Sequence, residues 1–137
     1  MSLIIKYYIF QMSAEVIFST SYDDKYPPQN MLSSGYSMFW TSTGLYPQEI
    51  VLSLPLQKVV NEIQVSCIGI KKLSIESCEN DSAVKFIVQS EIENIPNRSS
   101  VQDINCKFSS KSMSKIIKIV IHEGYGFFSC INTISIK

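Results

Sequence analysis

The sequence predicts an all-β chain that folds as a single β-sandwich of the jelly-roll kind, with about eight or nine strands. Alanine occurs only at positions 14 and 83, whereas the β-branched and aromatic residues that favour strands are plentiful. Several segments alternate apolar and polar residues with a period of two, which is typical of strands with one buried face. Polar turn signals separate these segments at short intervals, as they do in sandwiches and jelly rolls.

The first part of the chain contains three predicted strands. Residues 1–10 are apolar but short, and because they lack a basic leader we interpret them as a strand rather than a signal peptide. Residues 15–19 and 49–54 are also predicted strands. Pro27 and Pro28 predict an extended segment and no helix start before Asn30. Residues 30–39 are the least strand-like part of the chain and are expected to contain a helical turn.

Period-two alternation predicts the strands of the later part of the chain. Lys118 and His122 fall on the polar side of this pattern, and residues 85–92 fit it less cleanly. The alternating apolar positions are Ile63, Val65 and Cys67, then Leu73 and Ile75, then Ile117, Ile119 and Ile121, and finally Ile134 and Ile136.

Size and charge exclude several classes of protein. The 137 residues, 45% of them hydrophobic, suit one domain spanning residues 1–137. Twelve basic residues balance twelve acidic ones, which removes the electrostatic footprint of a nucleic-acid-binding protein and any strong pull toward an anionic membrane. No apolar run approaches the roughly 18 residues of a membrane span. The single histidine, His122, leaves no multi-histidine metal site, so we expect no enzyme.

The four cysteines are predicted to be free thiols with structural roles. They are far apart in the sequence and form no C-x-x-C pair, and we expect a reducing compartment. Cys67 falls on the apolar face of a predicted strand, where a free cysteine behaves as a small hydrophobic residue.

One stretch is specific enough to indicate a family. It reads E-V-I-F-S at 15–19, S-Y-D-D-K-Y-P-P-Q-N at 21–30, F-W-T-S-T-G at 39–44 and P-Q-E at 47–49. These motifs, in this order and spacing, resemble the intraflagellar transport subunit 25 family, a small discoidin-type (galactose-binding-like) jelly roll. The resemblance extends from Glu15 to the end of the chain, more loosely in the later strands. Phe39 and Trp40 are expected to anchor their loop in the core, and Gly44 to allow a tight turn.

The resemblance implies a scaffold rather than a catalyst. Family members pair with a Rab-like small GTPase, intraflagellar transport subunit 27, in the intraflagellar transport B complex with other transport-train subunits. It therefore implies a location in the cilium or flagellum and the cytoplasm. We expect the partner-binding surface on the loop at 41–49 and the neighbouring strand faces. The expected contact residues are Thr41, Thr43, Leu45, Tyr46, Gln48 and Glu49.

The family fold often carries a calcium site, and its ligands are degenerate here. Asn30 is kept, whereas Ser33, Met38 and Lys137 stand where the family pattern has Asp, Thr and Glu. No anionic side chain remains among these positions, although calcium prefers six to eight oxygens that include carboxylates. We therefore expect weak or absent calcium binding and no other cofactor. The Lys137 ammonium either replaces the cation near this site or is a solvated terminal lysine.

Several residues outside the family motifs, together with Trp40, could serve functions other than this adaptor role. A glycan- or lipid-binding discoidin-type module is the alternative, because loops at the end of such sandwiches bind ligands and Trp40 lies in one of them. His122 and Glu123 are neighbours on a predicted strand and point to opposite faces, which disfavours an acid–base pair. The basic run that includes Lys115 is interpreted as a solvated face. The aromatic turn at 124–128 either marks an exposed partner surface or packs back into the core.

Overall fold

The computed structural model describes residues 14–33, 38–82 and 85–137, and within these ranges the chain is almost entirely β. The strand predicted at residues 1–10 lies outside the described residues. The only helical element in the described ranges is a short 3₁₀ helix, η1 (Pro28–Leu32). The strands are β1 (Glu15–Ser19), β2 (Trp40–Thr41), β3 (Gln48–Val59), β4 (Glu62–Ile68), β5 (Ile70–Cys78), β6 (Ile87–Ile92), β7 (Gln102–Lys107), β8 (Met113–Gly124) and β9 (Cys130–Ile136).

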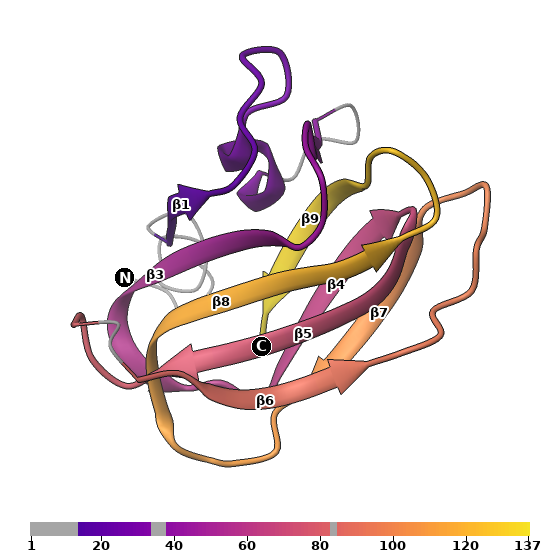
Figure 1. Ribbon diagram of the computed structural model, residues 1–137. Helices are drawn as coiled ribbons and strands as arrows, with labels where there is room; N and C mark the ends of the chain where they lie inside the picture. The colour runs from indigo at the N-terminus through magenta and orange to yellow at the C-terminus, as the bar shows by residue number, and fades with distance from the viewer. Residues whose placement is uncertain (1–13, 34–37, 83–84) are drawn as a thin grey trace, which may run out of the picture.

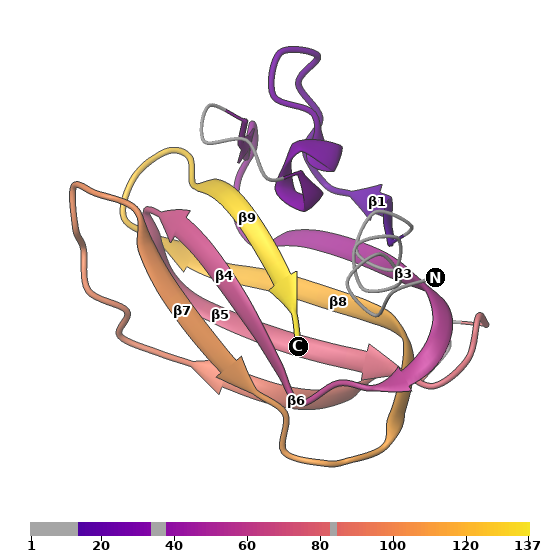
Figure 2. The ribbon, with the colours of Figure 1, turned by 180° about the vertical axis from the view of Figure 1, so that it is seen from behind.

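The strands form two antiparallel sheets that pack face to face. A five-stranded sheet has the order β1-β3-β8-β5-β6 and faces the viewer in Figure 1. A four-stranded sheet has the order β2-β9-β4-β7 and lies in front when the molecule is seen from behind in Figure 2. Helix η1 lies beside β1, at the end of the sandwich where β9 begins. The predicted β-sandwich class is confirmed.

The core lies between the two sheets, and strands of both sheets contribute to it. Ile119 pairs with Ile50 of β3 and with Ile75 of β5, so β8 is the central strand of its sheet. Ile117, Ile119 and Ile121 point into the core, as their alternation predicts. On the opposite side of β8, Ile116 is also buried; it belongs to a second, smaller cluster with Val51 and Cys78, covered by Phe86. The Lys118 ammonium lies 4.1 Å from the centre of the Phe86 ring.

Two local predictions need correction. The helical turn expected within residues 30–39 is present, but η1 begins at Pro28, so the exclusion of a helix start before Asn30 was wrong. Proline is tolerated in the first turn because the N–H that it lacks has no partner there, and Pro27 alone is extended. Strand β7 was not predicted: it is an edge strand in which Cys106 is the only buried residue.

The buried cysteines are free, as predicted. All four thiols are unpaired in the structure, and Cys67 and Cys106 have no exposed surface. Burial raises the pKa of the Cys67 thiol to about 12, because the thiolate loses its hydration, and the nearby Cys106 and Asp103 add to this effect. Burial likewise raises the pKa of Cys106 to about 11. Both groups therefore stay neutral and contribute to the core as small apolar side chains.

Replacing Cys67 with valine is expected to reduce the loss of stability at alkaline pH. In the unfolded chain the thiol loses its proton above its ordinary pKa of 9.0, whereas the folded protein keeps it until about 12. The stabilisation is therefore complete below pH 9, and each pH unit above that removes up to about 1.4 kcal/mol. Urea unfolding at about pH 8 and about pH 10 measures this loss. Equal losses in wild type and Cys67→Val would contradict the assignment.

Candidate functional site

The candidate site is the end of the sandwich where three loops meet. These are residues 20–27 between β1 and η1, residues 42–47 between β2 and β3, and residues 125–129 between β8 and β9. We call the last two the apical loops. They lie side by side in both views of the ribbon (Figures 1 and 2). The 42–47 loop contains part of the segment that the sequence predicts to bind a partner.

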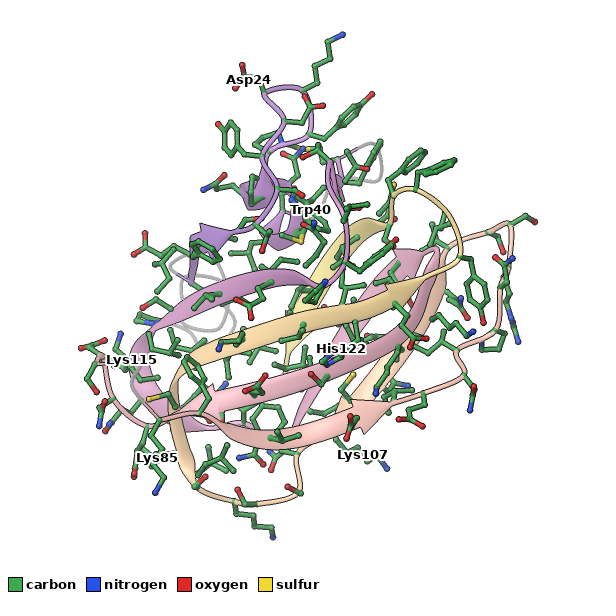
Figure 3. The ribbon with its side chains drawn as sticks, in the orientation of Figure 1. Asp24, Trp40, Lys85, Lys107, Lys115 and His122 are labelled. Carbon is green, nitrogen blue, oxygen red and sulfur yellow. The ribbon has the colours of Figure 1, made fainter. Side chains whose placement is uncertain are left out.

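Trp40 joins this end to the core. Its side chain is fully buried, and its indole Nε1 donates a hydrogen bond to the Ser21 carbonyl oxygen at 3.2 Å (Figure 3). The predicted anchoring by Trp40 is thereby confirmed. Phe39 takes a different role, since it is half-buried and stacks on Tyr26 with 4.5 Å between ring centroids. Both adjacent aromatics thus contact residues between β1 and η1, Trp40 at Ser21 and Phe39 at Tyr26.

A buried polar network fixes the 42–47 loop from below. Ser21 and Gln48 are almost without solvent exposure. The Ser21 hydroxyl donates to Gln48 Oε1 at 2.5 Å and accepts the Thr43 backbone N–H at 2.9 Å. Gln48 Nε2 in turn donates to the Leu45 carbonyl at 2.7 Å. The polar groups of Ser21 and Gln48 are therefore used within the fold.

A second set of bonds joins the two apical loops through Ser129. The Ser42 N–H donates to the Ser129 carbonyl at 2.9 Å, and the Ser129 N–H donates to Ser42 Oγ at 2.8 Å. The Ser129 hydroxyl lies 2.7 Å from the Tyr46 hydroxyl and donates to the Gly69 carbonyl at 3.1 Å. Gly124 must be glycine here, because a Cβ at that position would lie 2.0 Å from the Tyr46 hydroxyl oxygen.

The six predicted contact residues fall into three pairs. Thr43 is exposed and Leu45 is 87% exposed, so both are open to a partner, while Thr41 and Glu49 are half-buried on their strands. Tyr46 and Gln48 are held by the internal hydrogen bonds just described.

The sequence does not decide whether the aromatics at 124–128 are exposed or packed into the core, and the structure shows them to be exposed. Phe127 is 95% exposed and Phe128 61% exposed. Tyr125 is partly covered: its hydroxyl donates to the Ile95 carbonyl at 2.5 Å, and the Lys71 ammonium lies 5.8 Å from its ring.

Three of the four degenerate calcium positions lie together. Asn30 Nδ2 donates to the Phe39 carbonyl at 3.0 Å, and Ser33 Oγ donates to the Asn30 carbonyl at 2.9 Å and lies 3.5 Å from Met38 Sδ. Lys137 follows β9 at the opposite end of that strand from the Trp40 pairing, and its ammonium donates to Gln64 at 3.3 Å. With no carboxylate among the four, these residues do not fit a calcium ion.

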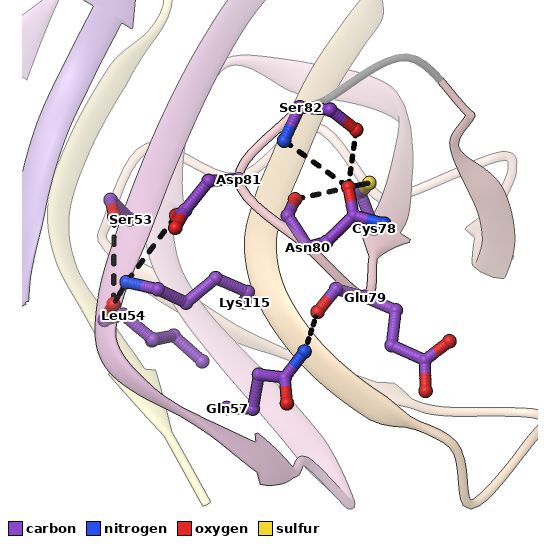
Figure 4. Close-up of polar contacts among 9 residues, drawn as sticks. All are labelled: Ser53, Leu54, Gln57, Cys78, Glu79, Asn80, Asp81, Ser82 and Lys115. Carbon is purple, nitrogen blue, oxygen red and sulfur yellow. Dashed lines mark hydrogen bonds and ion pairs between the residues drawn. The ribbon is translucent and has the colours of Figure 1, made fainter.

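Further candidates from the sequence have structural partners. His122 Nε2 lies 2.8 Å from Ser74 Oγ. Lys115, from the basic run, is mostly buried: its ammonium donates to the Leu54 carbonyl and lies 3.6 Å from the Asp81 carboxylate (Figure 4). The described ranges contain no group of three or more His, Cys, Asp or Glu side chains placed to hold a metal. Nor do they contain a helix that is long and apolar enough to cross a membrane.

The fold is that of the galactose-binding-like β-sandwiches. The family 32 carbohydrate-binding module of Clostridium perfringens NanJ, in complex with galactose, matches with a TM-score of 0.78 and 19% identity, covering 93% of this chain and 96% of that one. Chitosan-binding module 1 of the chitosanase/glucanase from Paenibacillus sp. IK-5 matches with a TM-score of 0.74 and 12% identity, covering 91% and 93%. At these identities the likeness shows the fold alone.

No family model matches the chain. Individual sequence relatives do match it, and they are more specific than the fold. Intraflagellar transport protein 25 of Chlamydomonas reinhardtii is 30% identical in an alignment of 125 residues, which covers 88% of this chain and 63% of that protein. Its Homo sapiens homolog is 32% identical over 53% of this chain and 51% of that protein, and its Mus musculus homolog 23% identical over 88% and 84%. This chain therefore spans between half and two thirds of the first two relatives. These relatives, all named as intraflagellar transport protein 25 or its homologs, confirm the resemblance drawn from the motifs.

Replacing Ser21 with alanine is expected to destabilise the fold by about 1–3 kcal/mol, because it leaves Gln48 Oε1 and the Thr43 N–H without their buried partner. Ser53→Ala is a matched control, since the half-buried Ser53 hydroxyl makes only a 3.5 Å contact with the neighbouring Leu54 carbonyl. The free energy of unfolding in urea should change by less than about 0.5 kcal/mol in this control. Similar losses in both variants would rule out a special role for Ser21.

Proposed function

We propose that this chain is a non-enzymatic subunit of the intraflagellar transport B complex, in the cilium or flagellum and the cytoplasm. One observation carries the proposal: 88% of the chain aligns with a protein named for intraflagellar transport. The family resemblance adds the finer part, a heterodimer with a Rab-like small GTPase, intraflagellar transport subunit 27, within a larger set of transport-train subunits.

The geometry of the apical loops supports an adaptor role. Ser21, Gln48 and Ser129 use their polar groups to hold the loops in place, rather than presenting them to a substrate. A rigid surface loses little conformational entropy when a protein partner binds it. Thr43 and Leu45 contact the partner in this proposal, together with Thr41 and Glu49 at its margins. Tyr46 and Gln48 act through the loop conformation that they maintain.

A glycan- or lipid-binding function is the second candidate. Solved structures with this fold include carbohydrate-binding modules, and two of them hold galactose-containing ligands. Exposed aromatic rings are a common platform for sugar stacking, and Phe127 is 95% exposed beside the loop that contains Thr43 and Leu45. A glycan array separates this candidate from the adaptor, which should bind no glycan on it.

Co-expression with the cognate Rab-like GTPase is expected to yield a stable pair. A specific heterodimer buries enough surface to persist through size-exclusion chromatography at micromolar concentration. The measurement is co-elution of the two chains in one peak of the mass of the pair. The control is an unrelated small GTPase of similar size, which should elute separately. Separate elution of the cognate pair would count against the GTPase part of the proposal.

We propose that this chain does not bind calcium tightly, and calorimetry is expected to show no such binding. Asn30, Ser33 and Met38 provide amide, hydroxyl and thioether groups in place of carboxylates. The protein is first treated with a chelator and then titrated with calcium chloride. One site of micromolar affinity would contradict the proposal. Ser33→Asp, which restores the family's acidic residue, is the matched variant and should bind calcium more tightly than wild type.

A further inference from the structure

We propose that Leu45, Phe127 and Phe128 form the docking anchor for an uncharged, apolar surface of the protein partner. We call these residues the apical ridge. The inference rests on the proposed adaptor function and adds to it a second loop, the one between β8 and β9, which neither the family motifs nor the predicted contact residues include.

Exposure is the first observation. Leu45 is 87%, Phe127 95% and Phe128 61% exposed, although these are large apolar side chains. Single exposed apolar residues are ordinary on a protein surface, whereas several on adjacent loops mark an interaction site. The two loops are adjacent because Ser42 and Ser129 exchange hydrogen bonds at their base.

The ridge is also held rigidly from below. The Leu45 carbonyl accepts from buried Gln48. The loop with the phenylalanines is held at both ends, by the Tyr125 N–H on the Gly69 carbonyl at 3.0 Å and by Ser129 on the same carbonyl at 3.1 Å. Gly69 has φ +84°, and a Cβ there would lie 3.3 Å from the Phe128 carbonyl oxygen. The side chains are thus displayed on a preorganised backbone, which favours their use as binding hot spots.

The absence of charged side chains on the apical loops indicates which kind of partner binds the apical ridge. Residues 41–47 and 124–129 contain no Asp, Glu, Lys, Arg or His, so the apical loops carry no side-chain charge. Nucleic acids and anionic bilayers are bound through clusters of Lys and Arg, which these loops lack. An apolar protein surface complements uncharged phenylalanine and leucine side chains, and the exposed Thr43 supplies a polar group at the rim. These observations favour a protein partner over a membrane or a nucleic acid.

The test compares two variants for binding to the Rab-like GTPase. The double variant Phe127→Ser/Phe128→Ser removes two of the three anchor side chains, and the dissociation constant should rise by about tenfold or more. Leu56→Ser is the matched control: Leu56 is a 72% exposed apolar residue near the opposite end of β3, and its replacement should leave affinity unchanged. Both variants are also unfolded in urea, where exposed positions should change stability by less than about 0.5 kcal/mol.

A second measurement uses only the wild-type complex, so it tests the inference even if the double variant does not fold. Hydrogen exchange of residues 124–129 should slow when the GTPase binds, and unchanged exchange there would overturn the inference. Wild-type affinity in the double variant would overturn it too, while the adaptor function stands. A wild-type chain that does not bind the GTPase defeats the proposed function and this inference together. Flotation of wild type, but not the double variant, with neutral phosphatidylcholine vesicles would make the ridge a membrane contact and overturn the protein assignment.

Discussion

The burial of Trp40 is the interaction on which the loop end of this protein depends. Strand β2 has only two residues, and such a short strand contributes little pairing of its own. A fully buried indole adds several kilocalories per mole of burial free energy, roughly 3–5 on truncation, and its N–H satisfies the Ser21 carbonyl. Ser21 then uses its hydroxyl on Gln48 and Thr43. One aromatic residue thus brings β1, β2 and β3 into a common arrangement.

This arrangement explains why the surface of the apical loops is apolar. The polar groups of Ser21, Ser42, Gln48 and Ser129 are turned inward, where leaving any one of them unpaired would be costly. The side chains left on the outside are those that take no part in the network, and Leu45 and Phe127 are among the most exposed of them. Rigidity and apolar exposure therefore have the same structural cause, and the protein contact that we propose would use both.

Most of the fold was predictable from the sequence, since alternation in Ile63–Cys67 and Ile117–Ile121 is strong and those strands are found as β4 and β8. Strand β7 was not predicted because an edge strand needs few apolar residues, and Gln102–Lys107 buries only Cys106. At the site, alternation predicts nothing for glycine-flanked loops, so the exposure of Phe127 was visible only in the structure. The position of Lys137 relative to the loop end was likewise not predictable from the sequence. Strand β9 pairs with β2 at its start, so Lys137, which follows β9, lies at the other end of that strand.

At the degenerate calcium positions, hydrogen bonds between neutral groups connect η1 to the start of β2. A metal ion would connect η1 to the start of β2 by drawing several oxygens to one point. Here the Asn30 amide donates to the Phe39 carbonyl, and Ser33 closes the end of η1 on the Asn30 carbonyl, so neutral hydrogen bonds make the same connection. Because these bonds carry no net charge, the acidic residues that a cation would require are unnecessary. The connection between η1 and β2 is therefore made by neutral groups, and the large side chains exposed on the apical loops are apolar.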